Sequence, residues 1–498
     1  MMKLLFGDIH NHCGISYGFG SIKNALDNAS SHLDFCGITG HAFWPDMPPV
    51  TDETKFLVDF HEKGFAKLKG NYPDDVKLIS DKNKPGKFTT FISYEMHSHH
   101  FGDHHIVSGD MSLPLLTSAT TPKEFYEMTQ EYSDTIIIPH HIAYTPDYRG
   151  INWDEYDDNL FPVVEVISKH GCGLSDKHPM PYYHTMGGRD SRNTAYYGLK
   201  QGKRFGFVGS TDHHAGYPGS YGDGCLGVLA ENNDRHSIIE AIKNRRTYAL
   251  NADKIKCIFS VNDNLFGSIV TDSSEKKTIR YSITASYFID KIVILKNLKP
   301  IRIINGEEFD EVNSKGKYKV RLEFGWGGQS SLKTWDFEVK TTRGKIVGLE
   351  KCFRGKSVLA PTDGVEISED CNIIDNHVEI VSTDCVVGRV QTLRNETTTS
   401  PSTSAVVLEI DGDLDTRLSI KVNDTIVEKT IRDLCDCSYT YQTGITNSPN
   451  FKIHQCIPES QYTIDGGLID WSAGNCFYHM EVFQKNGSMA LISPVYFE

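Results

Sequence analysis

Histidine is concentrated in the first half of the 498-residue sequence. Of the 21 histidines, only His377, His454 and His479 lie beyond residue 237, whereas an even spread would place about half of them there. Imidazole binds divalent metals such as zinc, manganese and iron, and it titrates closer to neutral pH than other side chains. The first half is therefore where we expect metal binding or proton transfer.

These histidines, together with several carboxylates, follow short apolar runs that are typical of β-strands. His10 and His12 are two residues apart, so on a strand they point to the same side about 7 Å apart and can chelate one cation. Other candidate ligands stand at or near the ends of later strands: His41, Glu95, His104, His105, His140, His141, Glu165, His170, Asp212, His213 and His214. Any one of these histidines alone would ordinarily be a core or surface residue. Their shared placement is what indicates an active site.

The number of candidate ligands also indicates how many metals to expect. A single metal takes about three or four protein ligands, and imidazole nitrogen and carboxylate oxygen suit zinc, manganese and iron. Eight or more candidates therefore predict at least two metals that share a bridging carboxylate.

The elements that must position these side chains alternate between strand and helix. The predicted strands are residues 3–10, 34–40, 88–95, 104–109, 135–139, 162–168 and 204–210. The predicted helices are residues 21–32, 53–69, 121–132, 190–201 and 234–245. This alternation is typical of βαβ units around a parallel sheet, and seven strands in about 250 residues favour a closed or nearly closed (β/α) barrel over an open sheet. Chemistry in such a barrel takes place at the C-terminal ends of the strands.

The sequence changes character after Asp253. Helical periodicity is almost absent there, and strands are predicted at residues 255–261, 278–285, 291–296, 318–324, 334–341, 405–410 and 480–484. We therefore expect two regions, residues 1–253 and residues 254–498, of which the second is mostly β and sandwich-like. Two small β units with a boundary near residue 350 are an alternative for that second region.

Composition narrows the function classes. The net charge of −14 disfavours a nucleic-acid partner, because phosphate backbones need clustered Lys and Arg. No run of 18 apolar residues occurs, so no membrane span is expected, and the short apolar N-terminus predicts a cytoplasmic protein. The 12 cysteines are scattered and are expected to be reduced, mostly buried thiols. The expected partner is a small-molecule substrate, and a homo-oligomer is left open.

Several pieces of the sequence together resemble one known family. The resemblance rests on Asp8-Ile9-His10-Asn11-His12, Ile38-Thr39-Gly40-His41, Glu95, His104-His105, Pro139-His140-His141 and Ser210-Thr211-Asp212-His213-His214. As a set these motifs, which with the stretch around Arg245-Arg246 cover residues 8–249, resemble the PHP (polymerase and histidinol phosphatase) superfamily. Residues 164–171, 216–219, 245–249 and 487–495 look most similar to its carbaryl-hydrolase-like branch. The resemblance implies a distorted (β/α)7 PHP barrel.

The resemblance also implies a ligand set. One metal would be held by His10, His12, Glu95 and Asp212, and Glu95 would bridge to a second metal held by His105 and His140. His104 and His141 are rivals of their neighbours. A third metal would use His41 and His214, but the stretch 13–18 lacks a histidine found in many three-metal relatives, and His170 could replace it. Two or three ions of zinc, manganese or iron are therefore expected.

The expected reaction is hydrolysis by a metal-bridged hydroxide, with the metals also holding the developing oxyanion. His170 and His213 are the candidate general acids for the leaving group. Asp8 is expected to orient an imidazole rather than bind metal. The candidate substrate contacts are Arg189, Tyr17 and Tyr217.

Phosphoester hydrolysis is favoured because it is the commonest activity of the superfamily that the motifs resemble. Carboxyl or carbamate ester hydrolysis, or amide hydrolysis, is the alternative within the same fold. A non-enzymatic carbohydrate- or protein-binding role for the β-rich region is a separate class, which the intact ligand set disfavours. A proofreading exonuclease is disfavoured by the acidic charge balance.

Overall fold

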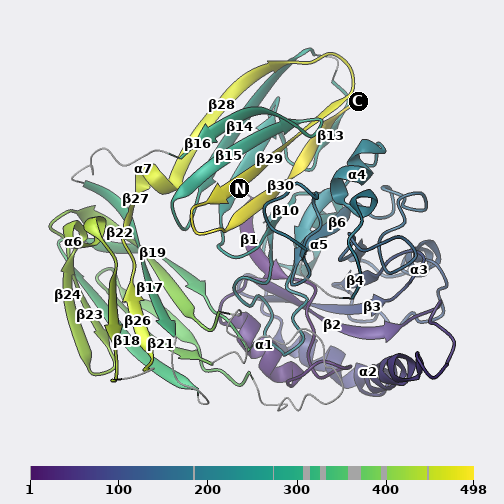
Figure 1. The fold of residues 1–498 in the computed structure, drawn as a ribbon, viewed down its shortest axis with the longest axis horizontal. Helices are drawn as coiled ribbons and strands as arrows, with labels where there is room; N and C mark the ends of the chain where they lie inside the picture. The colour runs from purple at the N-terminus through teal and green to yellow at the C-terminus, as the bar shows by residue number, and fades with distance from the viewer. Residues whose placement is uncertain are drawn as a thin grey trace.

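The computed structural model describes residues 2–182, 186–272, 274–306, 315–325, 332–356, 372–393, 401–445 and 448–498. Strands and helices alternate only in part over the first 253 residues (Figure 1). The elements there are β1 (Lys3–Asp8), α1 (Ile22–Ser30), β2 (Phe35–Phe43), α2 (Lys55–Lys82), β3 (Thr89–Met96), β4 (His104–Ser108), α3 (Pro122–Met128), β5 (Thr135–Pro139), β6 (Val163–Ser168), β7 (Gly171–Cys172), the 3-10 helix η1 (Ser191–Asn193), α4 (Ala195–Lys200), β8 (Gly206–Gly209), β9 (Cys225–Ala230), α5 (Arg235–Lys243) and β10 (Thr247–Leu250).

Local sequence explains where several of these helices begin. The side chains of Ser21, Thr121 and Asp234 each accept a hydrogen bond from a backbone N–H in the first turn of α1, α3 and α5. Helix α2 is longer than predicted, because it continues through Pro73 and keeps a buried face as far as Ile79. None of the described helices is both long and apolar enough to span a membrane.

A closed barrel of seven parallel strands is not evident in the described residues. The largest sheet is open and has the strand order β16-β15-β29-β30-β10-β9-β1-β2-β3-β4-β5, with β13 paired to β30. Strands β6, β7 and β8 form a separate sheet. Only β1–β2 and β2–β3 are parallel among the first five strands, whereas β4 runs antiparallel to both β3 and β5.

The short link between β3 and β4 explains much of this difference. A parallel neighbour needs a crossover of about a dozen residues or more, usually a helix. Residues 97–103 provide only a short connection without a helix, so β4 turns back along β3. The alternation of strand and helix in the sequence thus overestimated how many strands lie parallel.

Strands dominate after residue 253, apart from the short helices α6 and α7. The elements are β11 (Lys256–Val261), β12 (Asn264–Leu265), β13 (Ile269–Val270), β14 (Lys276–Thr284), β15 (Ile289–Lys296), β16 (Lys299–Asn305), β17 (Lys315–Gly325), β18 (Lys333–Thr342), β19 (Lys345–Cys352), β20 (His377–Ser382), β21 (Cys385–Thr392), β22 (Ser404–Asp413), β23 (Arg417–Val422), β24 (Thr425–Thr430), α6 (Ile431–Asp436), β25 (Tyr439–Gln442), β26 (Asn450–Ile453), β27 (Ile457–Pro458), α7 (Glu459–Tyr462), β28 (Thr463–Trp471), β29 (Cys476–Gln484) and β30 (Met489–Phe497).

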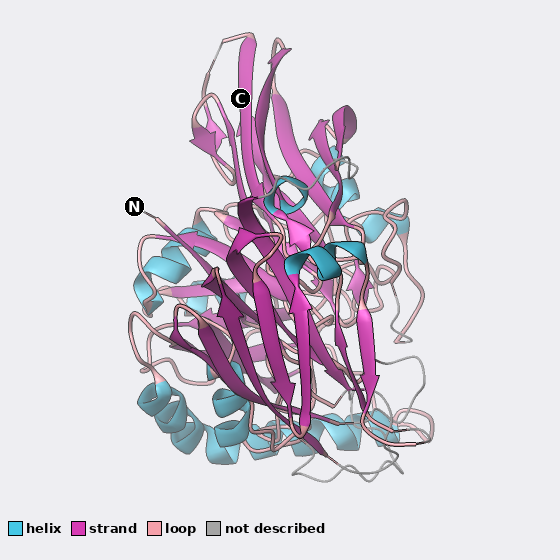
Figure 2. Cartoon of the chain, turned by 90° about the vertical axis from the view of Figure 1, so that its left-hand side faces the viewer, coloured by secondary structure: helices cyan, strands magenta, loops and turns pink. Residues whose placement is uncertain are grey.

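Two sheets of this second region share one apolar core. The orders are β19-β22-β17-β26-β25, with β27 beside β17, and β20-β21-β18-β23-β24. Alternate residues of their strands, among them Leu322, Val339, Val386, Leu408 and Ile420, lie in the same buried cluster. Figure 2 faces the side of the molecule where these strands run beside one another.

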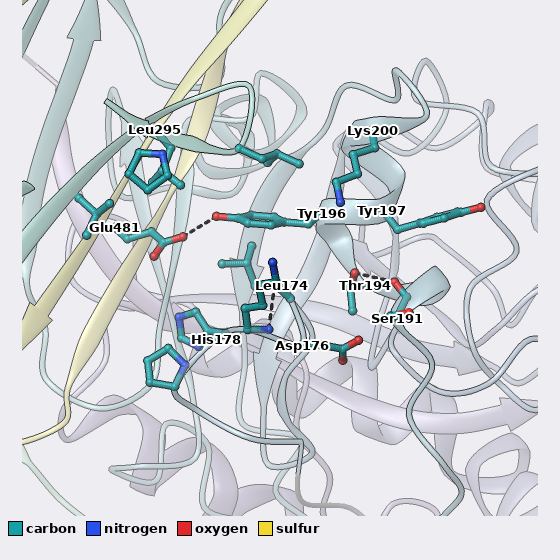
Figure 3. A pocket seen from close by; sticks show the side chains of 16 residues that line it. Leu174, Asp176, His178, Ser191, Thr194, Tyr196, Tyr197, Lys200, Leu295 and Glu481 are labelled. Atoms are coloured by element: carbon teal, nitrogen blue, oxygen red, sulfur yellow. Dashed lines mark hydrogen bonds between the residues drawn. The ribbon is translucent and has the colours of Figure 1, made fainter. Parts of the chain in front are cut away.

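Strands from both regions share the largest sheet, because β15, β16, β29 and β30 continue it beyond β10. Side chains add to this connection. Tyr196 of α4 donates a 2.6 Å hydrogen bond to Glu481 of β29 (Figure 3), and Arg321 of β17 pairs at 2.6 Å with the buried Asp253. The division into two domains at residue 253 therefore remains a prediction. The backbone hydrogen bonding of the largest sheet continues from one region into the other.

Asp253 is expected to stabilise the junction of the two regions. It accepts hydrogen bonds from Tyr221, Arg321, Gln484 and Asn486. Burial opposes its charge, but the Arg321 guanidinium and these donors lower the pKa of Asp253 to about 2. Because this folded-state pKa lies below the ordinary value, the stabilisation is complete above the ordinary Asp pKa and is lost as pH falls toward 2.

We predict that Asp253→Asn lowers the free energy of unfolding by about 3 kcal/mol or more, because it leaves Arg321 buried without its charge partner. Urea denaturation at pH 7 measures this, and the difference from wild type should shrink as pH is lowered toward 3. Asp263→Asn is the control, since its pair with Arg280 is exposed and should change stability by less than about 0.5 kcal/mol. Equal effects of the two substitutions would contradict the prediction.

Candidate metal centre

The residues that follow β1 lie between β2 and the segment after β8. The backbone N–H of Thr39 in β2 donates to the carbonyl of Asn11, and the N–H of Asp212 donates to the carbonyl of His10, both at 2.8 Å. Asp8 fixes this junction from behind, accepting bonds from the backbone N–H groups of His10, Thr211 and Gly219. Burial raises the pKa of Asp8 to about 6. Asp8 therefore orients backbone rather than an imidazole ring.

Three neighbouring strands place ligands side by side in register. His41 of β2 is opposite Glu95 of β3, and Glu95 is opposite His105 of β4. Residues paired across strands share one face of the sheet, so the three side chains project together. Although β4 runs antiparallel, His105 stands near its beginning, and the beginning of β4 lies beside the end of β3. The reversed strand therefore still delivers its histidine to the same edge.

Four side chains form the centre of the site. The carboxylate Oε1 of Glu95 lies 2.8 Å from His10 Nε2 and 3.1 Å from His12 Nε2. Asp212 Oδ1 lies 3.1 Å from His12 Nε2 and 3.4 Å from His10 Nε2. All four residues are buried, and their ligand atoms lie within 4.8 Å of one another, which is a spacing that one cation could fill.

Two further groups flank this centre and share its histidines. His10, His105 and His140 form one group, and His12, His41 and His214 form the other, with ligand atoms again within 4.8 Å. His105 Nδ1 lies 3.1 Å from His140 Nδ1. Among the described residues, His104 belongs to none of these groups; its Nδ1 hydrogen-bonds the carbonyl of Gly102 and its ring packs against Phe161.

Hydrogen bonds to the other ring nitrogens aim the imidazoles at the site. Nδ1 of His12 contacts the carbonyl of Thr39 at 3.0 Å, Nδ1 of His41 contacts the Ser16 hydroxyl at 2.7 Å, and Nδ1 of His214 contacts the carbonyl of Asp212 at 3.0 Å. Their Nε2 atoms are thus the ones that remain for a ligand. Metal-binding histidines are commonly held in this way.

The electrostatics of the donors suit a cation. Burial lowers the pKa values of His41, His105, His140 and His214 well below the ordinary value, which favours the neutral imidazole that binds metal. Burial alone would raise the pKa of Glu95, but the surrounding histidines hold it well below its usual range. Burial likewise would raise the pKa of Asp212, but His10 and His170 hold it well below its usual range. These buried imidazoles and carboxylates therefore fit divalent zinc, manganese or iron.

The same cluster includes two candidates left outside the implied ligand set, Glu165 and His141, and three residues not named from the sequence, His97, Asp103 and Arg149. Glu165 Oε2 lies 2.8 Å from His10 Nδ1, on the side of the ring opposite Glu95. His97 forms a group with His41 and Glu95, and Asp103 forms one with His140 and His141. His97 follows Glu95 by two residues, so the alternation of an extended chain was a signal for it. Arg149 comes from a loop whose sequence gave no periodic signal.

The two candidate general acids lie in different places. His170 Nε2 is 2.5 Å from Asp212 Oδ2, and its Nδ1 is 2.7 Å from the Tyr144 hydroxyl. His213 is buried outside the ion-holding groups, and its Nδ1 accepts a hydrogen bond from the N–H of Ala215. Burial lowers the pKa of His170 to about 4, although Asp212 opposes this shift.

A cavity of about 260 Å³ opens onto the cluster. Tyr17 lines it, with its ring stacked on His41 at 3.5 Å between centroids. The other two predicted substrate contacts do not line it: Arg189 pairs with Asp176, and Tyr217 is buried against Asn376. The lining residues include Trp44, Phe56, Leu57, Phe60, Tyr148, Arg149, His170, Asp212 and His214.

Three residues of the site have left-handed backbone conformations that are uncommon without glycine. They are His141 with φ of 31°, Arg149 with φ of 64° and Asp212 with φ of 52°. Such strained positions concentrate at ligand-binding sites, where surrounding contacts hold them. A second cavity of about 540 Å³ between α4 and β29 (Figure 3) contains none of the ion-holding groups found in the described chain.

Comparisons with known proteins give distant similarities. No family model matches the chain. An uncharacterised protein of Chlamydia pneumoniae is 27% identical over 262 residues, which are 47% of this chain and 40% of that protein. An uncharacterised protein of Chlamydia trachomatis serovar D is 26% identical over 130 residues, or 24% of this chain and 21% of that protein. The matches thus span less than half of either relative.

One solved structure is also similar. It is a two-domain protein from Bacteroides vulgatus described as containing a predicted PHP-like metal-dependent phosphoesterase. The TM-score is 0.32 at 15% sequence identity, covering 59% of this chain and 78% of that one.

We predict that Glu165→Gln lowers the affinity for zinc or manganese by about 10- to 100-fold, because the amide removes the negative charge behind His10. Competition with a chromogenic chelator measures the affinity. Glu155→Gln is the control, since Glu155 is exposed and should leave affinity unchanged. An unaltered affinity in a folded Glu165→Gln protein would refute a role for Glu165 in supporting the metal ligand.

Proposed function

We propose that this protein is a metal-dependent hydrolase, and that its substrate is a small-molecule phosphoester. The observation that carries the proposal is a set of three buried ion-holding groups that border a cavity, in which the central group shares His10 with one neighbour and His12 with the other. A structural metal site is usually closed, whereas a catalytic one keeps an open side for substrate. Here Glu95, Asp212, His41 and His214 belong to the groups and also line the cavity.

Two or three divalent cations, when bound, supply Lewis acidity and lower the pKa of a water toward neutrality. The first would be held by His10, His12, Glu95 and Asp212, the second by His105 and His140 with Glu95, and the third by His41 and His214 with His12. Glu95 belongs to the central group and also lies near the two flanking groups. His41 Nε2 is 3.9 Å from its Oε2, and His140 Nε2 is 3.7 Å from its Oε1. Zinc, manganese and iron match this donor set.

The chain itself supplies positioning and proton transfer. His170 lines the cavity, and the Tyr144 hydroxyl at its Nδ1 directs Nε2 toward Asp212. We assign to His170 Nε2 the transfer of a proton to the leaving oxygen. His213 lies outside the cavity lining and is not assigned this role. Tyr17 covers His41 and restricts water on that side of the site.

Hydrolysis of an uncharged carboxyl or carbamate ester is the second candidate. The apolar part of the cavity lining, formed by Trp44, Phe56, Leu57 and Phe60, favours it, because these side chains would accept an aromatic or alkyl group. Arg149 at the same cavity favours a phosphoester instead, since a guanidinium pairs well with phosphate oxygens.

The test is hydrolysis of p-nitrophenyl phosphate, bis-p-nitrophenyl phosphate and p-nitrophenyl acetate by protein loaded with manganese or zinc. We predict activity toward a phosphoester that a chelator abolishes and added metal restores. His170→Asn should lower kcat by about 100-fold or more while metal content is unchanged. His100→Asn, at an exposed pair with Asp147, is the matched control and should retain activity.

Hydrolysis of the acetate ester alone would select the second candidate. Activity that survives complete metal removal would contradict both.

A further inference from the structure

The described residues that line the cavity at the metal cluster include a single permanently charged side chain of positive sign. Among the described residues that line it, Arg149 is the one Lys or Arg side chain, and it shares the cavity with Glu95, His170 and Asp212. Its side chain is 13% exposed, whereas the Asp103 carboxylate that it pairs with is fully buried. The positive end of this ion pair therefore faces the cavity, and the negative end lies behind it.

Several contacts hold the guanidinium in this orientation. Nε donates to Asp103 Oδ2 at 2.8 Å, and Nη2 contacts the same oxygen. The guanidinium carbon lies 5.5 Å from the centre of the Trp44 ring, a cation–π arrangement. Nη1 lies 3.2 Å from the sulfur of Met186, which is a weak acceptor, so this end of the group keeps hydrogen-bonding capacity for a ligand.

The loop that carries Arg149 is built to deliver it. Arg149 has a φ of 64°, and its N–H donates to the carbonyl of His99 at 3.2 Å. A side chain on the following Gly150 would clash, because its Cβ would lie 2.0 Å from the carbonyl oxygen of Tyr144. Asn193 donates to that same oxygen at 2.7 Å and fixes the turn. Strain of this kind is maintained where it serves a site.

Arg149 is also close to the ion-holding groups. Its Nη2 is 2.7 Å from His97 Nδ1, and His97 Nε2 is 3.6 Å from Glu95 Oε2. One imidazole ring thus separates the guanidinium from the carboxylate shared by the metal groups. Arg149 and Glu95 also line the same cavity, so one ligand in that cavity could contact both side chains.

We propose, resting on the proposed hydrolase function, that Arg149 is the residue that selects an anionic phosphate monoester. The guanidinium binds a non-bridging phosphoryl oxygen, and Asp103 and Trp44 are its positioning residues. Trp44, Phe56 and Phe60 contact the alcohol part of the ester, which is therefore aromatic or otherwise apolar. Arg189, which pairs with Asp176 away from the cavity, has no part in this recognition.

The first experiment measures binding of inorganic phosphate to metal-loaded protein by calorimetry. Arg149→Gln should raise the Kd by about 10- to 100-fold with metal content unchanged, because a charge-assisted bond is lost. Arg149→Lys keeps the charge and should fall between wild type and Arg149→Gln. Arg192→Gln, at an exposed pair with Asp190, is the control and should bind phosphate as wild type does. Unchanged phosphate affinity in both Arg149 variants would overturn the proposal.

The second experiment compares an anionic with an uncharged substrate. Arg149→Gln should lower kcat/KM for p-nitrophenyl phosphate by about 10- to 100-fold and leave that for p-nitrophenyl acetate within about twofold. Equal losses on both substrates would overturn selection by Arg149. If neither ester is hydrolysed by wild type, the proposed function fails, whereas the phosphate Kd still reports on Arg149.

A separate observation concerns two cysteines far from this cavity. The sulfur atoms of Cys435, in α6, and Cys456, just before β27, lie 3.2 Å apart. Backbone contacts hold the two segments together: Cys456 N–H donates to the carbonyl of Leu434 at 2.9 Å, and Gln455 Nε2 donates to the carbonyl of Cys435 at 2.6 Å. Closing to a disulfide, at about 2.05 Å, needs a movement of about 1 Å.

We infer that Cys435 and Cys456 form a reversible disulfide by exchange with a small-molecule disulfide. The half-buried Cys435 thiolate attacks that compound and releases one thiol, and Cys456 then attacks the mixed disulfide and releases the second. Two protein thiols become one disulfide, and the small disulfide is reduced to two thiols. The bond would join α6 to β27 across the edge of the sheet that contains β17.

Incubation with oxidised glutathione followed by alkylation and mass spectrometry tests this inference. We expect Cys435 and Cys456 to be protected together and the melting temperature to rise by several degrees, and dithiothreitol to reverse both. Cys435→Ser should remove both effects, whereas Cys437→Ser, at an exposed thiol two residues away, should retain them. Alkylation of both cysteines in treated wild-type protein would overturn the inference.

Discussion

The compensation of buried charge is the constraint on which the rest of this structure depends. Glu95, Asp103 and Asp212 are carboxylates that lie almost out of reach of solvent. An isolated buried carboxylate is very costly, so each must be surrounded by donors or cations. Here the compensation comes from imidazoles on several different strands and from Arg149. A fold that satisfies this requirement necessarily brings those segments to one point.

The open sheet meets the requirement without closing into a barrel. Parallel β1, β2 and β3 end at one edge, and antiparallel β4 begins at that edge, so His41, Glu95 and His105 lie in register. The segment after β8 contributes Asp212 and hydrogen-bonds to the extension of β1. The direction of a strand thus matters less than which of its ends carries the ligand. Asp103 extends the same principle, because it lies behind the cavity and orients three residues that line it, His97, His141 and Arg149.

The sequence predicted the parts of the site whose residues follow the two-residue alternation of a strand or stand at a strand end. The spacing of His10 and His12 and the positions of His41 and Glu95 follow from strand ends, and the structure brings these side chains together. The choice between His104 and His105 could not be made, because adjacent residues on a strand differ only in the face they use. The sequence predicted a closed barrel of parallel strands because the number of apolar runs does not reveal strand direction, and β4 is in fact antiparallel. Arg149 was missed because its position depends on a strained loop and on contacts with Asp103 and Trp44, which no local pattern encodes.

The central claim is that these buried donors hold a cluster of cations beside a substrate cavity. Anomalous diffraction from crystals grown with manganese or zinc, collected at the absorption edge of the metal, tests it most directly. The account predicts two or three anomalous peaks within coordination distance of His10, His12 and Glu95. Crystals of metal-treated protein with no peak among these side chains, or with metal only at distant surface residues, would contradict it.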